Sequence, residues 1–147
     1  MTLRSEFTDP DESPGLLLWQ VTNRWQAAQR AALAPLDLTH VQFVLLAAST
    51  WLVARGDAVN QKVLADVAAT DPMMTSQVLR TLEAKGLVHR QDHPTDRRAK
   101  AIAPTEVGVA LVNRAIVVVE QCDAAFFAAL GARIPAFTRG LRDLRDS

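Results

Sequence analysis

The chain has 147 residues, of which 49% are hydrophobic and 22% are charged. Because disorder requires low hydrophobicity and a high net charge, this composition excludes a disordered chain, and the length argues against two independent enzymatic domains. Sixteen basic side chains balance sixteen acidic ones, so the overall charge identifies no class of partner.

The first predicted element is a helix that begins at Pro14. The polar residues before it, 1–13, are expected to form a flexible N-terminal segment. Ser13 is a good N-cap and Pro14 suits the first helical turn, and apolar residues then recur at helical spacing until Pro35 interrupts them.

Three further helices are marked by signals at their ends. Thr39 and Gln42 have the spacing of a capping box before the apolar run VQFVLLAASTWLVA. The next two helices form a pair joined by a short turn, with Asp71 placed to cap the second one. The predicted bounds of the pair are about 60–68 and 72–85. Gly86 is the stop signal of its second helix, and Gly56 is that of the earlier helix that follows Thr39.

Beyond these helices the pattern changes to that of a β-hairpin. The short runs LVHR and AKAIA suit strands, and the polar segment QDHPTDRR between them suits a long hairpin tip. A long helix is predicted from Thr105 and a last one after Pro135. A helix-turn-helix followed by a hairpin predicts a mainly α fold with a small β-hairpin wing, a winged helix-turn-helix.

The second helix of the pair has one face suited to reading DNA. On a helical wheel, one side is predicted to face the core and carries Met74, Thr75, Val78, Leu79 and Leu82. The other side offers an apolar contact, hydroxyls, a carboxamide and a guanidinium, which are the groups that read major-groove edges. The residues predicted to contact DNA are Met73, Ser76, Gln77, Arg80 and Thr81. A merely solvated helix face is the alternative.

Positive charge is concentrated in the same part of the chain. Residues 74–100 carry six basic side chains against three acidic ones. At the predicted hairpin tip, Arg97 and Arg98 suit a minor groove or phosphates, and Asp96 is close enough to orient an arginine by a charge-assisted bond. A solvated charged loop is again the alternative.

Catalytic and metal chemistry are poorly supported. His89, Asp92, His93 and Asp96 lie across a strand end and a loop, with no cysteine pair nearby, so no metal site is predicted. The chain has no nucleotide-binding loop or nucleophile motif, and no catalytic residue or cofactor is expected. Cys122, the single cysteine, is expected to be a buried, inert thiol in a reducing cytoplasm.

The stretch LADVAATDPMMTSQVLRTLEAKGLVHR, followed by HPTDRRAKAIAPTEVG, closely resembles the helix-turn-helix and wing of the MarR family of multiple antibiotic resistance regulators. The resemblance covers roughly 38–108. It implies a transcriptional regulator, a dimeric repressor released by a small-molecule ligand, in which Arg98 enters the minor groove and Asp96 orients it. Met73 and Met74 stand where small hydroxyl residues are usual, and Pro104 stands for a usual leucine, which predicts a shorter second strand.

The resemblance also implies how a single MarR-like chain is divided. Residues 1–13 are the flexible N-terminal segment, 37–104 the DNA-binding region, and 14–36 with 105–147 the dimerisation helices. Independently, the segment 105–130 is apolar on too many sides for a lone surface helix, which predicts a homodimer, while its polar residues argue against a membrane span. The expected partners are a second copy and double-stranded DNA with a pseudo-palindromic operator.

A small aromatic or anionic effector is the third expected partner. The candidate pocket residues are four aromatic side chains and two anchors for an anion: Trp19, Trp25, Phe43, Trp51, Arg24 and His40. Core packing is the alternative role of the aromatics. A winged-helix protein-interaction module or anti-regulator without DNA binding, and more remotely a small hydrolytic enzyme, remain open, and salt-dependent DNA binding would discriminate them.

Overall fold

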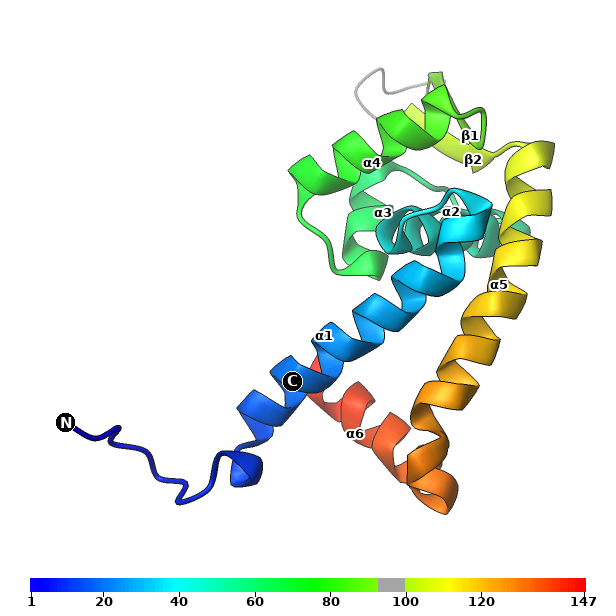
Figure 1. Cartoon of the computed structure of the whole chain (residues 1–147). Coiled ribbons are helices and arrows are strands. Elements are labelled where there is room, and N and C mark those ends of the chain that lie inside the picture. The colour runs from blue at the N-terminus through cyan, green and yellow to red at the C-terminus, as the bar shows by residue number, and fades with distance from the viewer. Residues whose placement is uncertain (93–99) are drawn as a thin grey trace.

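The computed structural model describes residues 1–92 and 100–147 (Figure 1). The helices are α1 (Pro14–Leu33), α2 (His40–Ala54), α3 (Gln61–Ala68), α4 (Pro72–Ala84), α5 (Glu106–Phe127) and α6 (Ile134–Arg145). The strands β1 (Val88–Asp92) and β2 (Lys100–Pro104) pair antiparallel, with Arg90 opposite Ile102. Short 3-10 turns lie at Pro10–Glu12, Ala34–Leu36 and Ala128–Arg133. The predicted winged helix-turn-helix fold is therefore confirmed.

The elements form a compact head and an open frame (Figure 1). The head contains α2, α3, α4 and the two strands. The long helices α1 and α5 run away from the head and diverge, and α6 turns back from the end of α5 toward α1. The turn before α6 is made at Gly131, whose φ of 54° and ψ of −125° break the helical path.

The helix ends lie where their capping residues predict. The hydroxyl of Ser13 accepts a hydrogen bond from the backbone nitrogen of Leu16, and Thr39 and Gln42 form a complete capping box. The carboxylate of Asp71 caps α4 in the same way. Because each cap is a contact between residues close in sequence, these boundaries follow from the local sequence alone.

One apolar core holds the recognition helix α4 in the head. Its fully buried side chains come from the end of α1 and from α2, α3 and α4: Leu33, Leu45, Leu46, Leu64, Leu79 and Leu82. The strands add Val88 and Ile102, and α5 adds Val112, Ala115 and Val119. Truncating one such leucine to alanine costs about 2–5 kcal/mol, so the core fixes which face of α4 points outward.

Two sequence predictions about this region are wrong. Met74 does not join the core and is 45% exposed, because it lies at the edge of the buried face of α4, whose centre is formed by Thr75, Leu79 and Leu82. Pro104 does not shorten the second strand, because it pairs with Val88 at the end of the ladder. The hydrogen bond that continues the connection comes from the next residue, Thr105, to the carbonyl of Leu87.

The helical run at the end of the chain leaves much apolar surface uncovered. By length and composition alone, Glu106–Arg145 is long and apolar enough to cross a membrane, and only 11% of its most apolar stretch is buried within the chain. Large apolar side chains exposed on α5 and α6 include Val107, Val117, Phe137, Leu141 and Leu144. A further apolar surface is needed to cover them.

Candidate DNA-reading surface and ligand pocket

The outer face of α4 carries the residues predicted to contact DNA. Met73 is 74% exposed at the N-terminal end, and Gln77, Arg80 and Thr81 are exposed along the helix. Ser76 is half-buried, and its hydroxyl accepts a hydrogen bond from Nη2 of Arg80 at 3.1 Å. The hydroxyl of Thr81 donates to the carbonyl of Gln77 at 3.2 Å, so its proton is already used within the helix.

The start of the wing is fixed to the same helix. Nε of Arg90 in β1 lies 3.7 Å from Oε2 of Glu83 on α4, so the acidic side chain nearest the reading face is paired with a cation. This pair ties β1, the described start of the wing, to the recognition helix. The predicted wing contacts, Asp96, Arg97 and Arg98, lie outside the described residues, and their role stays a prediction.

A cavity of about 420 Å³ lies between α1 and α2. Five of the six residues that line it have polar side chains: Asn23, Gln26, Arg30, Thr39, His40 and, as the apolar exception, Val41. Arg30 supplies a permanent cation, since a guanidinium is not deprotonated in proteins. The predicted cationic anchor, Arg24, is exposed and is not among the residues that line this cavity. Helical spacing explains the difference, because positions 23, 26 and 30 share a face of α1 that position 24 does not.

His40 is the predicted anchor that does line this cavity. Its Nδ1 lies 2.7 Å from Oε1 of Gln26. Because a carboxamide oxygen only accepts, Nδ1 donates in this pair and Nε2 is left as an acceptor. Burial lowers the pKa of His40 below its ordinary value, and the negative charge of Asp123 opposes that effect. A neutral His40 at pH 7 leaves Arg30 as the cation of the cavity.

A buried polar cluster joins α1 to α5 beside His40. The Asp123 carboxylate accepts hydrogen bonds from Nε1 of Trp25 at 2.8 Å and from Nε2 of the fully buried Gln29 at 2.7 Å. The ring of Trp25 meets the ring of His40 edge-on, with 4.9 Å between their centroids. Because charged acceptors make strong hydrogen bonds, Asp123 fixes the tryptophan that borders the histidine.

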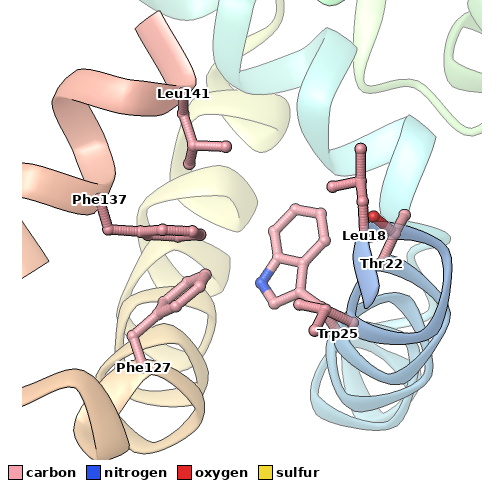
Figure 2. Close-up of a pocket in the computed structure, with 7 residues that line it drawn as sticks. Leu18, Thr22, Trp25, Phe127, Phe137 and Leu141 are labelled. Atoms are coloured by element: carbon pink, nitrogen blue, oxygen red, sulfur yellow. The ribbon is translucent and has the colours of Figure 1, made fainter. Parts of the chain in front are cut away.

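A second cavity, of about 210 Å³, lies on the other side of Trp25, where α1, the end of α5 and α6 meet (Figure 2). Its walls are almost entirely apolar and consist of Leu18, Val21, Thr22, Trp25, Phe127, Phe137 and Leu141. The rings of Phe127 and Phe137 lie 5.7 Å apart between centroids and face the indole across the cavity. It offers apolar contact and no anchor for a charge.

The remaining predicted pocket residues lie elsewhere. Phe43 is buried in the core of the head, which is the alternative role foreseen for the aromatics. Trp19 is 69% exposed on α1, and Trp51 is 55% exposed and stacks against the Arg55 guanidinium at 4.4 Å. The structure therefore brings together only Trp25 and His40 of the six candidates.

Sequence reasoning missed the polar partners of these two residues. Gln26 and Arg30 have the helical spacing that places them on the cavity, so a wheel of α1 that included polar residues would have found them. Thr39 lines the cavity from the start of α2. Gln29 and Asp123 are 94 residues apart in the chain, and each stands close to other polar residues that do not take part in this contact. Nothing in the local sequence signals that they meet.

The structure gives no support to thiol chemistry or to a metal site, the alternatives to DNA binding. Cys122 is half-buried rather than buried, and burial together with Asp123 raises the pKa of its thiol, so it is not an activated thiolate. Across the described ranges, 1–92 and 100–147, no group of three or more His, Cys, Asp or Glu side chains is arranged to hold a metal ion. Two members of the weighed metal set, His93 and Asp96, fall outside those ranges.

Comparison with known proteins identifies relatives over nearly the whole chain. The MarR family profile matches residues 38–100. The HTH-type transcriptional regulator YdcH of Bacillus subtilis is 46% identical over 144 residues, which cover 98% of this chain and 97% of that protein.

Solved structures have the same architecture. BpsR of Bordetella bronchiseptica, whose DNA binding is regulated by 6-hydroxynicotinic acid, is 28% identical with a TM-score of 0.86, over 97% of this chain and 99% of that one. Rv2887 of Mycobacterium tuberculosis in complex with p-aminosalicylic acid is 32% identical with a TM-score of 0.70, over 90% of this chain and 98% of that one.

Proposed function

The chain belongs to the MarR family of transcriptional regulators, and from this premise we propose that it is a cytoplasmic, dimeric repressor released by a small aromatic acid. It reads a pseudo-palindromic operator through α4 and the wing. The outer face of α4, the apolar surface of α5 and α6, and the cavity between α1 and α2 each support one part of this proposal.

The exposed face of α4 is the observation that carries the DNA-binding role. Met73, Gln77 and Arg80 project from a helix whose opposite face is locked into the core, and Glu83 at the edge of that face is paired with Arg90. Such a face can lie in the major groove, where a glutamine recognises adenine and an arginine recognises guanine. Arg98, oriented by Asp96, adds the minor-groove contact.

The exposed apolar surface of α5 and α6 supports the dimer. Because α6 also carries Arg139, Arg142, Asp143 and Arg145 within twelve residues, this surface suits a protein partner better than a lipid bilayer. A second copy presents the same self-complementary surface, as two-fold symmetric interfaces require. Two α4 helices then reach successive major grooves about one helical turn, or roughly 34 Å, apart.

The cavity between α1 and α2 supports the effector role. Arg30 offers a cation for a carboxylate, and His40 and Asn23 offer polar contacts beside the ring of Trp25. An aromatic acid of modest size has the matching chemistry, because its ring meets apolar carbon while its carboxylate meets a guanidinium. The relatives that bind p-aminosalicylic acid or respond to 6-hydroxynicotinic acid support this ligand class.

Fluorescence anisotropy tests the proposed function. A labelled duplex from the promoter beside the protein's own gene and a scrambled duplex are titrated across a salt series. We expect binding to the promoter duplex to be tighter by about a thousandfold or more, and its affinity to fall linearly on a logarithmic salt scale. Absence of salt-dependent binding to either duplex would contradict the proposal and favour a protein-interaction module.

A further inference from the structure

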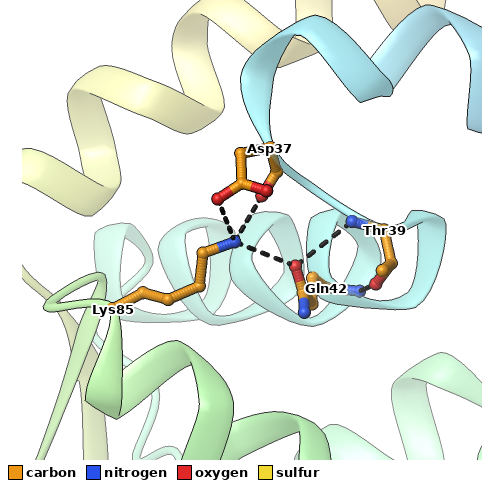
Figure 3. A network of polar contacts seen from close by, with 4 residues as sticks. All are labelled: Asp37, Thr39, Gln42 and Lys85. Carbon is orange, nitrogen blue, oxygen red and sulfur yellow. Dashed lines mark hydrogen bonds and ion pairs between the residues drawn. The ribbon is translucent and has the colours of Figure 1, made fainter.

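The C-terminal end of α4 is tied to the turn between α1 and α2 by one side chain, Lys85 (Figure 3). Nζ of Lys85 donates to the backbone carbonyl of Asp37, lies 3.5 Å from the Asp37 carboxylate, and donates to Oε1 of Gln42 at 3.3 Å. The lysine side chain is only 26% exposed, whereas that of Asp37 is 97% exposed. Because exposed ion pairs contribute little, the hydrogen bonds to the carbonyl and the amide define this link.

The oxygen of Gln42 that receives Lys85 has a second donor. Oε1 of Gln42 also accepts from the backbone nitrogen of Thr39 at 3.1 Å, as part of the capping box of α2. One acceptor therefore serves both the start of α2 and the end of α4. A shift of Thr39 changes the position or the strength of the bond to Lys85.

Thr39 forms part of the walls of two cavities. It lines the α1–α2 cavity together with His40, and it also lines a cavity of about 260 Å³ that contains Asp37, Gln42 and Lys85. A ligand in the first cavity therefore touches the residue whose backbone nitrogen shares an acceptor with Lys85. The side chain of Gln42 therefore connects Thr39, at the ligand cavity, with Lys85, at the end of the recognition helix.

The other side of the same helix end is fixed to α5. The hydroxyl of Thr105 donates to the carbonyl of Gly86 at 2.6 Å, and its backbone nitrogen donates to the carbonyl of Leu87 at 3.0 Å. The opposite end of α4 is attached to α3 and the turn after it, because Nε2 of Gln61 donates to the carbonyl of Pro72 at 3.1 Å and the hydroxyls of Thr70 and Thr75 lie 2.7 Å apart. A helix of this length spans about 20 Å, so a tilt of about 5° about its C-terminal end moves its N-terminal end, and α3 with it, by roughly 2 Å.

We propose that Lys85 is the positioning residue through which the α1–α2 cavity controls the angle of the recognition helix. This inference rests on the proposed function, because it assumes that α4 reads DNA and that the cavity holds the effector. It assigns to Lys85 no contact with DNA or with ligand. Its effect is on the coupling between the two sites, which is reciprocal: DNA binding changes the cavity as much as ligand changes DNA binding.

The first test uses no ligand. The changes Trp19→Phe and Trp51→Phe leave Trp25 as the only tryptophan of the chain, beside His40 at the cavity. The emission of Trp25 is then recorded while a duplex selected by this protein from a random pool is added to saturation. We expect the emission of Trp25 to shift when the duplex saturates the protein with Lys85 unchanged or the variant Lys85→Arg. In Lys85→Met this emission shift should be reduced at least by half. Lys62→Met, which removes an exposed lysine of α3, is the matched control and should retain the full shift.

The second test adds salicylate as the probe. The ratio of operator Kd with and without saturating salicylate should lie between about 5 and 150 in the parent, the usual range for coupled sites. Lys85→Met should bring this ratio below about 2, the level at which little coupling remains. The Kd for salicylate itself is measured separately, so loss of ligand binding is distinguished from loss of coupling. Melting temperatures confirm that each variant is folded.

The outcomes separate the inference from its premise. An equal shift of the Trp25 emission in the parent and in Lys85→Met overturns the role of Lys85. The role is also overturned if the parent shows no emission shift when saturated with the duplex, because the two sites are then not coupled. Failure to select any duplex contradicts the proposed function itself, and the inference falls with it. A reduced shift in Lys85→Met that Lys85→Arg restores supports the proposal.

Discussion

Gly108, in the first turn of α5, packs directly against the backbone carbonyl of Leu87, the residue that leads from α4 into β1. A Cβ on Gly108 would overlap the carbonyl oxygen of Leu87 and stand 3.0 Å from its carbonyl carbon. Both partners are backbone atoms that no side-chain rotation can move. The start of α5 and the end of the recognition helix therefore depend on a glycine at this position.

Gly108→Ala is predicted to destabilise the protein. Because the backbone of α5 must shift to relieve the overlap, the free energy of unfolding should fall by about 1–3 kcal/mol, the usual cost of overpacking. Urea denaturation at a fixed protein concentration measures the change. Gly15→Ala is the matched control, because a Cβ there meets only the hydroxyl of Ser13 at 4.0 Å and should not destabilise. A Gly108→Ala variant as stable as the parent would contradict the close approach.

How far the sequence predicted the fold depends on the range of the interactions. The helix caps at Ser13, Thr39 and Asp71 involve neighbours in the chain, so their spacing was sufficient to place the helices. Met74 was misplaced because it lies at the edge of the buried face of α4, whereas Thr75 in the same turn lies at the centre of that face and is fully buried. Whether a neighbouring element buries a side chain depends on the tertiary fold, and the helical period of the sequence does not contain this information.

The candidate site was predicted less well than the fold. The face of α4 with Gln77 and Arg80 follows from helical period, and the structure exposes these residues as expected. The polar link between Trp25 and Asp123 joins residues 98 apart, and Lys85 is 48 residues from Asp37. Pairs at such separations leave no periodic signal in a single sequence, and these are the contacts that shape the cavities.

Gln77→Ala is predicted to change the choice of base. The carboxamide is exposed in the middle of the reading face, where it can make two hydrogen bonds to one adenine edge. Its loss should cost about 1–3 kcal/mol on the preferred duplex and relax selectivity at one position of each half-site. Affinity for a scrambled duplex should barely move. Equal losses on both duplexes, measured by anisotropy, would mean that Gln77 contacts phosphate and reads no base.

Arg98→Ala is predicted to fail in a different way. Because Arg98 is predicted to enter the minor groove and neutralise phosphate, it should support specific and non-specific binding together. Both affinities should fall, and the slope of log affinity against log salt should flatten by about one. Asp96→Ala should give a milder form of the same change, since the arginine remains without its orienting carboxylate. Parental binding by Arg98→Ala to both duplexes would identify this segment as a solvated loop.

His40 is predicted to make stability depend on pH. Burial lowers its pKa in the folded protein below the ordinary value of 6.5, so the unfolded chain takes up a proton first as the pH falls. The stability that the neutral ring contributes is present above pH 6.5 and is lost as the pH falls through the lowered pKa. His40→Gln should reduce the decline in unfolding free energy between about pH 7 and 5, the range in which histidine changes charge. Identical pH profiles for the parent and His40→Gln, measured at one protein concentration, would contradict the assignment.

A symmetric dimer that reads DNA with two α4 helices and two wings should recognise a two-fold symmetric site. Selection of duplexes from a random pool by the purified protein, with the mass of the bound complex determined in the same preparation, tests it most directly. We expect one dimer on an enriched pseudo-palindrome whose half-site centres lie about 10 base pairs apart, one turn of the double helix. A monomer on a single asymmetric half-site, or a pool with no enriched sequence, would contradict it.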